Sequence, residues 1–333
     1  MKVLVIGGSG FIGTRLLAVL LDRGHDVTNL DRVVSPAYPA LTTVGDVCST
    51  ETVQLAATGK DAIVNLAAEH RDDVQPLSRY TEVNVHGAAV VTASAIAAGV
   101  DRIVFTSSVA VYGLDKVNPD ESWEPEPFNE YGRTKLAAES IFTTWAEGDA
   151  ARSLAIIRPS VVFGEGNRGN VHTLASQVAS GRFIQVGTGG NRKSMSYVGN
   201  IVEFLADSLD APVGVRLTNF ADKPDLTTTE LVALLQKALG KRGSRLRLPL
   251  SLGVAAGHTL DLVARVSGRT FPISAVRMRK FAAETTVSTD RLAATGFIPR
   301  YSLEDSLVRT LATEFPQLAA QAARLDERDT PTS

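Results

Sequence analysis

The sequence is poor in cysteine, in net charge and in long apolar runs. Cys48 is the single cysteine among 333 residues, which excludes an intrachain disulfide and a cysteine-based zinc site. The formal net charge of -2 lacks the basic excess of a general nucleic-acid binder, so we expect neither a nucleic-acid partner nor a metal site. The apolar run Val3–Ile6 is too short for a signal peptide, and no stretch reaches the roughly 18 to 20 residues of a membrane span. We therefore expect a cytoplasmic protein.

Short apolar runs alternate with helical patterns over the first 160 residues. The alternation predicts an α/β fold with a Rossmann-type, doubly wound parallel sheet. The expected strands, each brief and apolar, are Val3–Ile6, Asp26–Leu30, Ala62–Leu66, Arg102–Thr106 and Leu154–Ile157. The expected helices between them are Phe11–Arg23, Thr50–Thr58, Tyr80–Ala98 and Tyr131–Glu147.

The alternation loosens after Pro159. We expect one domain over residues 1–160 and a smaller C-terminal substrate lobe over 161–316, interleaved with the first and followed by a flexible tail over 317–333. Two further helices are expected, at Thr227–Leu239 and Leu303–Phe315.

A basic excess lies within the expected substrate lobe. Residues 237–300 hold twelve Lys or Arg and three Asp or Glu, a net charge of +9. An apolar run, Leu248–Ala264, lies inside this segment. The segment forms either a solvated surface or a site for anionic diphosphate or lipid headgroups.

Three glycines, Gly7, Gly10 and Gly13, directly follow the first expected strand. Gly7 permits a tight turn, Gly10 lets a diphosphate approach the backbone, and Gly13 lets the next helix pack against the strand. Phe11 and Ile12 begin that helix. Unpaired N–H groups at a helix N-terminus favour an anion, so the spacing predicts a dinucleotide-binding turn.

Acidic residues follow the next strands. Asp31 can accept hydrogen bonds from the adenosine ribose hydroxyls and would repel a 2′-phosphate, which favours NAD over NADP. Arg32 points the other way, because an arginine there can pair with that phosphate. Asp46, followed by Val47, stands where a side chain could bond the adenine amino group; a surface turn is the alternative reading.

Tyr131 and Lys135 lie four residues apart on an expected helix, so both face one side. A tyrosine has an ordinary pKa near 10, and an adjacent ammonium favours its phenolate. A serine at 107 or 108 ends the strand Arg102–Thr106, at the edge where open α/β sheets bind ligands. This serine could share a substrate hydroxyl proton with Tyr131.

These motifs, with Asn65-Leu66-Ala67-Ala68 and a Ser-Ser-x-x-x-Tyr-Gly run ending at Gly113, resemble the extended short-chain dehydrogenase/reductase family. The resemblance covers residues 1 to about 160. It implies that Ser108 is the catalytic serine beside Tyr131 and Lys135. Tyr112 and Asn84 would support the site. The full set of expected cofactor-binding residues is Gly7, Gly10, Phe11, Ile12, Gly13, Asp31, Arg32, Asp46, Val47, Leu66, Ala67, Ala68, Asn84, Ser107, Tyr131, Lys135 and Pro159.

Four longer strings, at 67–74, 105–113, 164–171 and 193–204, resemble a narrower group. Its members are bacterial epimerases that invert C4 of N-acetylglucosamine joined to undecaprenyl diphosphate. Where nucleotide-sugar epimerases carry an arginine for the substrate diphosphate, this chain has Lys193 beside Arg192. The expected substrate-binding residues are His70, Ser108, Tyr131, Asn167, Arg168, Asn170, Arg192, Lys193 and Arg279.

The resemblance implies an NAD-dependent 4-epimerase that acts through a 4-keto sugar on a lipid-linked sugar diphosphate, in O-antigen or other surface polysaccharide synthesis. Three alternatives stay open: an epimerase of UDP-hexoses or UDP-N-acetylglucosamine, an NAD(P)-dependent reductase or dehydrogenase, and a non-catalytic NAD-binding partner. Peripheral contact with an anionic membrane at its cytoplasmic face and assembly as a homodimer are both compatible with this interpretation.

Overall fold

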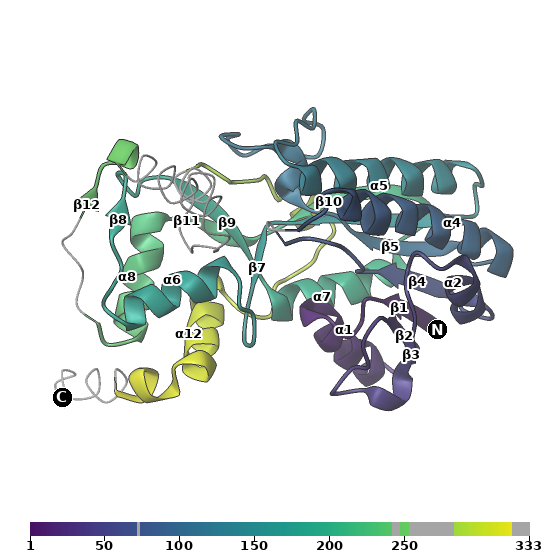
Figure 1. Cartoon of the computed structure of the whole chain (residues 1–333), viewed down its shortest axis with the longest axis horizontal. Helices are drawn as coiled ribbons and strands as arrows, with labels where there is room; N and C mark the ends of the chain where they lie inside the picture. Colours follow the sequence, from purple (N-terminus) through teal and green to yellow (C-terminus); the bar gives the residue numbers. More distant parts are fainter. Residues whose placement is uncertain (72–73, 242–246, 253–282, 322–333) are drawn as a thin grey trace.

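A parallel sheet of seven strands forms the larger lobe of the computed structural model, within the residues that the structure describes: 1–71, 74–241, 247–252 and 283–321 (Figure 1). The order of strands reverses its direction between β1 and β4, and ligands of doubly wound sheets bind at such a reversal. From one edge to the other, the strands are β10 (Gly214–Phe220), β6 (Ser153–Pro159), β5 (Arg102–Thr106), β4 (Ala62–Asn65), β1 (Lys2–Ile6), β2 (Asp26–Asp31) and β3 (Thr42–Val44).

Helices cover both faces of this sheet (Figure 1). Side chains alternate along a strand, so Val3 and Val5 of β1 join one apolar cluster while Leu4 and Ile6 join another. The first cluster includes the helices α1 (Phe11–Asp22) and α7 (Val198–Asp207). The second includes α2 (Thr50–Ala57), α4 (Gly87–Ala98) and α5 (Glu130–Glu147). The predicted Rossmann-type fold is confirmed.

Two strands of the sheet were given no bounds from the sequence, and one break in a helix was not predicted. β3 and β10 occupy the two edges, and β10 comes from residues that follow much of the smaller lobe in sequence. The helix expected over Tyr80–Ala98 is interrupted: α3 (Ser78–Tyr80) leads into the π-helix η2 (Thr81–His86), and α4 follows. π-helical turns often mark functional sites, and this one carries the buried Asn84.

The smaller lobe is built on a three-stranded sheet of β7 (Val161–Phe163), β9 (Arg192–Tyr197) and β11 (Asp222–Thr227). β8 (Gln185–Val186) pairs with β12 (Arg247–Leu248) at the far end of the lobe (Figure 1). Its described helices of eight residues or more are α6 (Asn170–Ala179), α8 (Thr228–Ala238) and α12 (Leu303–Glu314).

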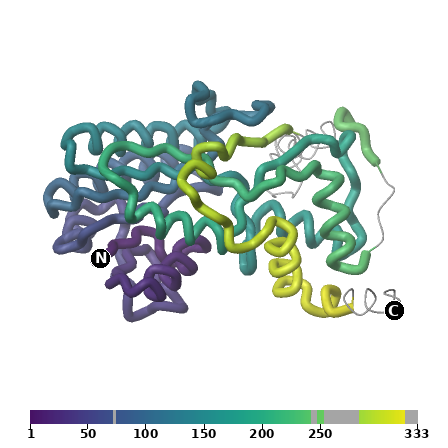
Figure 2. Tube along the Cα trace, turned by 180° about the vertical axis from the view of Figure 1, so that it is seen from behind, coloured from purple at the N-terminus to yellow at the C-terminus, as the bar shows by residue number. Residues whose placement is uncertain are grey.

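The C-terminal segment joins the two lobes. From residue 283 it crosses to the larger lobe, where α11 (Asp290–Ala294) packs near β10, and then returns to the smaller lobe as α12 beside α8 (Figure 2). Across the described ranges, no helix is both long and apolar enough to cross a membrane.

Candidate active site

The glycine turn after β1 has the close backbone contacts that its sequence predicts. Gly7 adopts a φ of +87°, and a Cβ there would lie 2.8 Å from the Ala67 backbone nitrogen. A Cβ at Gly13 would lie 2.4 Å from the Gly7 carbonyl oxygen. Gly10 is the N-cap of α1 and supplies no side-chain cap, so the first N–H groups of the helix keep their capacity for an anion. This turn fits a dinucleotide diphosphate, and Phe11 and Ile12 form the first turn of α1.

Asp31 lies beside the glycine turn at the end of β2. Its carboxylate accepts hydrogen bonds from the Ser9 N–H (3.0 Å) and the Val33 N–H (3.2 Å). Arg32 is exposed next to it. The structure thus brings Asp31 to the place where an adenosine ribose would follow the diphosphate.

Asp46 and Val47 lie between β3 and α2. The Asp46 carboxylate accepts a hydrogen bond from the Cys48 N–H at 2.9 Å. Val47 is buried, and a Cβ at Gly87, the first residue of α4, would lie 3.1 Å from it. Burial and the nearby Asp46 carboxylate raise the pKa of the Cys48 thiol to about 12, so this thiol is unreactive at neutral pH.

Leu66, Ala67 and Ala68 continue from β4 alongside the glycine turn. The Leu66 N–H donates to the Ile6 carbonyl at 2.9 Å, and the Ala67 N–H donates to Asn65 Oδ1 at 3.1 Å. Pro159 is the last residue of β6 and is buried. In the sheet, β6 and β1 lie on opposite sides of β4. All these residues stand at the carboxyl ends of strands, as the sequence predicts.

Both the oxygen and the nitrogen of the Asn84 side-chain amide form hydrogen bonds within the protein. Its Oδ1 accepts from the Glu69 N–H at 2.8 Å, and its Nδ2 donates to the Glu69 carbonyl and to Thr134 Oγ1, both at 3.0 Å. Both amide protons are therefore used within the protein. Asn84 fastens the segment after β4 to the helix α5, which carries Tyr131 and Lys135.

Ser107 and Ser108 lie at the carboxyl end of β5 but differ in their partners. The Ser107 N–H donates to the Ile157 carbonyl at 2.7 Å, whereas its buried Oγ has no hydrogen-bond partner among the described residues. Ser108 caps the short helix η3 (Val109–Tyr112) by accepting from the Ala110 N–H at 3.1 Å. The Ser108 hydroxyl also shares a hydrogen bond with Tyr131.

Tyr131 is half-buried and Lys135 is buried on α5, and desolvation shifts the pKa of both. Asn129 caps this helix by accepting from the Gly132 N–H at 2.9 Å. Desolvation raises the pKa of Tyr131 to about 12, and the hydrogen bond with Ser108 opposes that rise. Desolvation lowers the pKa of Lys135 to about 7, while the charge of Glu139 raises it. The Lys135 ammonium lies over the Phe105 ring, 4.5 Å from its centre.

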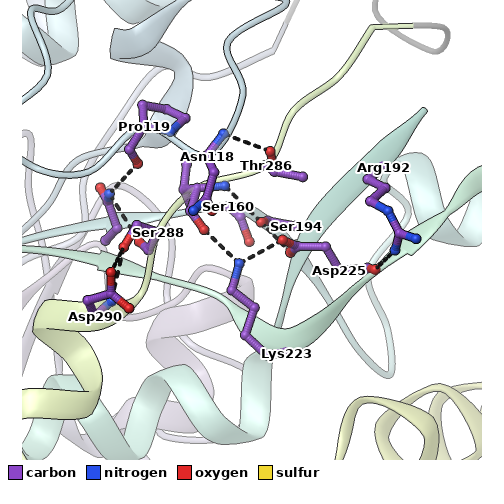
Figure 3. Close-up of polar contacts among 12 residues, drawn as sticks. Asn118, Pro119, Ser160, Arg192, Ser194, Lys223, Asp225, Thr286, Ser288 and Asp290 are labelled. Carbon is purple, nitrogen blue, oxygen red and sulfur yellow. Dashed lines mark hydrogen bonds and ion pairs between the residues drawn. The ribbon is translucent and has the colours of Figure 1, made fainter.

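Arg192 and Lys193 are neighbours on β9 and have different surroundings. Arg192 donates to the Asp225 carbonyl at 2.8 Å, and Figure 3 shows its side chain turned toward Asp225. Lys193 donates to the Ala283 carbonyl at 3.1 Å. Burial lowers the pKa of Lys193 to about 8, and the charges of Glu284 and Asp115 raise it. Lys193 therefore lies near the loop that follows η3, whereas Arg192 is held at β11.

The other expected substrate residues are dispersed. Asn167 bonds within its own loop, donating to the Val162 carbonyl (3.1 Å) and accepting from the Gly169 N–H (2.6 Å). Arg168 is paired with Glu314 of α12, although 67% of its side chain is exposed. His70 and Asn170 are exposed. Arg279 lies outside the described residues.

A buried ion pair next to the site was not predicted from the sequence. Arg158 of β6 and Glu139 of α5 form hydrogen bonds with each other between the sheet and this helix, which also carries Lys135. The signal that could have found them is a charged residue inside the otherwise apolar strand Ser153–Pro159. A lone buried charge is costly, so such a residue requires a partner.

Comparisons with known proteins agree with this geometry. Residues 3–216 match the model of the NAD-dependent epimerase/dehydratase family. A relative from Escherichia coli O157:H7, N-acetyl-alpha-D-glucosaminyl-diphospho-ditrans,octacis-undecaprenol 4-epimerase, is 46% identical over 316 residues, 94% of this chain and 95% of that enzyme. UDP-glucose 4-epimerase of Vibrio cholerae is 28% identical over 80% of this chain and 85% of its own length.

Solved structures share the fold. UDP-glucose 4-epimerase from Thermotoga maritima, solved with UDP-glucose, superposes with a TM-score of 0.75 at 21% identity over 94% of this chain and 98% of that one. The Thermus thermophilus UDP-glucose 4-epimerase, solved with NAD, gives 0.74 at 22% identity over 94% and 99%. The glycine turn, the Tyr131–Ser108 pair and the family match lead to one conclusion. The chain belongs to the NAD-dependent epimerase/dehydratase family, and NAD is its cofactor.

Proposed function

We propose that the protein is a 4-epimerase that inverts C4 of N-acetylglucosamine joined to undecaprenyl diphosphate, giving the N-acetylgalactosamine epimer. The observation that carries this proposal is the 46% identity, over 94% of the chain, with the Escherichia coli enzyme of that name. The Tyr131–Ser108 hydrogen bond, with Lys135 one turn further along α5, supports it chemically. The product would serve O-antigen or other surface polysaccharide assembly.

Tyr131 would move the proton on the sugar O4. Inversion needs one group that takes this proton and later returns it, and the hydroxyls of Tyr131 and Ser108 already share a hydrogen bond. A phenol whose pKa burial raises to about 12 is neutral at pH 7, which suits the return of the proton to a 4-keto sugar. Taking the proton needs a cation that stabilises the phenolate, and Lys135 would supply it.

NAD, when bound, supplies the acceptor and the donor of the C4 hydride. The glycine turn and the first N–H groups of α1 would hold its diphosphate. Asp31 would hold the adenosine ribose, and the unpartnered Ser107 Oγ would contact the cofactor at the sheet edge. Lys135 would hold the nicotinamide ribose.

Lys193 is our candidate for the substrate diphosphate. It lies near Asp115, in the loop that follows η3, and η3 begins directly after Ser108. Arg168 pairs with Glu314 and Arg192 donates to the Asp225 carbonyl, both away from this loop, whereas Lys193 donates to the Ala283 carbonyl. A lysine binds phosphate as a point charge, without the planar fork of an arginine. The diphosphate contact would therefore depend on the protonation of Lys193.

Parallel assays test the proposed function. Purified protein is given N-acetylglucosaminyl-diphospho-undecaprenol and, separately, UDP-N-acetylglucosamine, and the ratio of the two sugar epimers is measured. We expect epimerisation of the lipid-linked substrate at a much higher kcat/KM. Efficient turnover of the UDP-sugar alone would instead favour the nucleotide-sugar epimerase.

Peripheral contact with an anionic membrane is a further part of the proposal. It is supported by the far end of the smaller lobe, where Arg247 and Leu250 are exposed and Leu252 is 56% exposed. Exposed apolar side chains next to a cation suit the boundary between headgroups and acyl chains. Each Lys or Arg near an anionic surface adds about 1 kcal/mol of attraction, which salt screens.

Liposome flotation tests this contact. We expect binding to vesicles that contain anionic lipid at low salt, weaker binding at high salt, and weaker binding again for Arg247→Glu and for Leu252→Ser. Arg216→Glu, an exposed change on β10 in the larger lobe, is the matched control. Equal flotation of all four proteins, or flotation of none, would contradict the proposed contact.

Assembly as a homodimer stays a prediction. Light scattering coupled to size-exclusion chromatography gives the mass in solution. A mass of twice 35.4 kDa supports the homodimer, and a mass of 35.4 kDa contradicts it.

A further inference from the structure

A buried, two-pronged ion pair joins β6 to α5. Arg158 Nε donates to Glu139 Oε1 at 2.9 Å, and the second guanidinium nitrogen donates to Glu139 Oε2 at 2.6 Å. Arg158 is 3% exposed and Glu139 is 5% exposed. Because desolvation cancels much of the attraction in such a pair, an apolar pair of similar size would stabilise the fold about as well. Stability alone therefore does not explain these two residues.

Glu139 lies one turn beyond Lys135 on the same face of α5. Residues four apart on a helix are neighbours, and both side chains are buried. Desolvation lowers the pKa of Lys135, and the opposing influence is the negative charge of Glu139. Glu139 thus bonds to Arg158 of β6, and its charge also acts on Lys135 one turn away along the helix.

We propose that Glu139 and Arg158 are positioning residues for Lys135: the guanidinium fork fixes the carboxylate, and the carboxylate keeps the buried ammonium charged. The inference rests on the proposed function, in which the Lys135 cation stabilises the Tyr131 phenolate. Glu139 and Arg158 lie outside the Ser108–Tyr131–Lys135 set, and their role would be to keep Lys135 of that set protonated. Neither residue would touch the sugar or the cofactor.

The pair is itself held from the substrate side. The third nitrogen of Arg158 donates to the Tyr112 hydroxyl at 2.7 Å, and that hydroxyl donates to Asn219 Oδ1 at 2.9 Å. Asn219 Nδ2 donates in turn to the carbonyls of Pro119 (3.2 Å) and Ser288 (3.3 Å). The residue before Ser288, Val287, donates its N–H to Ser194 Oγ on β9 of the smaller lobe at 3.1 Å, and Figure 3 shows Ser288, Pro119 and Ser194 close together. The position of the guanidinium therefore depends on contacts that reach the smaller lobe.

Several titratable groups surround this face of α5, and each enters the expected pH response. They come from α5 itself, from α3, from η3, from β6 and from the loop before α5. They are Tyr131, Glu139, Tyr80, Tyr112, Arg158 and Glu121. Among these, Glu139 is the one whose charge acts on Lys135 in the direction of protonation.

The direction in which the alkaline limb of the kcat profile moves depends on which protonation state of Lys135 is active. If the ammonium of Lys135 is required, activity falls as pH rises through its pKa. Removing the Glu139 charge removes the influence that raises this pKa, so the alkaline limb of the kcat profile moves to lower pH. An opposite charge at close range moves a pKa by about 1 to 3, so we expect a shift of about one pH unit or more.

The test compares Glu139→Gln, Arg158→Lys and Tyr112→Phe with Arg133→Gln. Arg133 is exposed and pairs with Glu130 on the same helix, so it is a control for breaking an ion pair of α5. We expect the alkaline limb to move most in Glu139→Gln, less in Arg158→Lys, least in Tyr112→Phe, and not at all in Arg133→Gln. An unmoved limb in Glu139→Gln, or in Tyr112→Phe should Glu139→Gln fail to fold, would overturn the proposal.

A second readout does not depend on turnover. Lysines labelled at Cε are titrated by NMR, and Lys135→Met identifies the Lys135 signal. We expect Lys135 to lose its proton at lower pH in Glu139→Gln than in the unmutated protein. An unmutated protein inactive on both sugar substrates would refute the proposed function, whereas identical Lys135 titrations in the two proteins would refute this inference.

Discussion

The two lobes differ in what they do with charged side chains. In the larger lobe, the charges on and beneath the helix of Tyr131 are buried: Lys135, Glu139 and Arg158 lie between the sheet and α5. In the smaller lobe, Arg168 pairs with Glu314 and Arg192 pairs with Glu230, and both arginines are at least half exposed. A buried charge feels its neighbours strongly, whereas water screens an exposed pair.

This difference separates two tasks. The larger lobe fixes the protonation of its groups through burial, as the raised pKa of Tyr131 and the lowered pKa of Lys135 show. In the smaller lobe, the described arginines on β9 and on the loop before α6 pair with carboxylates of the same lobe. Lys193 differs from these exposed arginines because desolvation lowers its pKa to about 8. We therefore expect substitutions in the larger lobe to change kcat strongly. We expect few substitutions of cations in the smaller lobe to change substrate binding.

The largest expected effect comes from Tyr131→Phe. This change removes the proton carrier and leaves the ring in place, so kcat should fall on the order of a thousandfold. Bound NAD, released with acid and quantified, should stay at the level of the unmutated protein. Turnover within tenfold of the unmutated protein would remove the chemical task from the larger lobe.

Gly13→Ala should have the next largest effect. Its Cβ would lie 2.4 Å from the Gly7 carbonyl oxygen and 2.5 Å from the Gly8 Cα, so the glycine turn must move. Overpacking of this kind costs about 1 to 3 kcal/mol, which corresponds to an NAD affinity roughly tenfold to a hundredfold lower. Isothermal titration of NAD-free protein measures it.

Gly190→Ala is the matched control in the smaller lobe. A Cβ there would meet nothing closer than Thr188 Oγ1 at 3.6 Å. The NAD affinity of this variant should equal that of the unmutated protein. Equal losses in both variants would mean that the glycine turn has no particular relation to NAD.

Lys193→Met sharpens the comparison within the smaller lobe. Loss of a charged contact costs about 1.5 to 3 kcal/mol, so we expect KM for the lipid-linked substrate to rise roughly tenfold to a hundredfold. In the unmutated protein, KM should rise as pH rises through about 8, because the Lys193 ammonium is then lost. The KM of Lys193→Met should not change with pH in this range.

Arg168→Gln serves as the control for this prediction. The Arg168 side chain is exposed and paired with Glu314, and such pairs contribute about 0 to 1 kcal/mol. KM should change less than about fivefold. A large rise in KM for Arg168→Gln with none for Lys193→Met would reverse the roles of the two residues.

Asp31→Ala should have the smallest effect of the series. The Asp31 carboxylate is held by the N–H groups of Ser9 and Val33 beside the glycine turn. Its removal should lower the NAD affinity about tenfold and reduce the preference over NADP, since the repulsion of a 2′-phosphate is lost. Equal affinities for both cofactors in the unmutated protein would contradict the assignment.

The sequence predicts the elements whose pattern is local. Short apolar runs predicted β1, β2, β4, β5 and β6 to within two residues at each end, and they matched β5 at both ends. β10 was missed because it is an edge strand whose first three residues are exposed. Its place beside β6 is decided by a chain return across the smaller lobe. β3 was expected before Asp46 but was given no bounds, because a strand of three residues carries no periodicity.

The candidate site divides in the same way. The glycine turn and the Tyr131/Lys135 pair follow from backbone sterics and helix spacing, so residues near in sequence suffice to predict them. The pairing of Arg168 with Glu314 and the linkage from Arg158 to Asn219 join residues that are distant in sequence. No local pattern contains such partners, and so the sequence could not predict which carboxylate or hydroxyl each arginine contacts.

One measurement tests the central claim most directly. N-acetylglucosaminyl-diphospho-undecaprenol labelled with deuterium at C4 is converted over many turnovers, with the near-ultraviolet absorbance of NADH followed throughout. We predict an N-acetylgalactosamine product that keeps deuterium at C4, with no rise in NADH absorbance, because an epimerase returns the hydride that it removes. Stoichiometric NADH release, or a keto product without the label, would contradict the claim and identify a dehydrogenase.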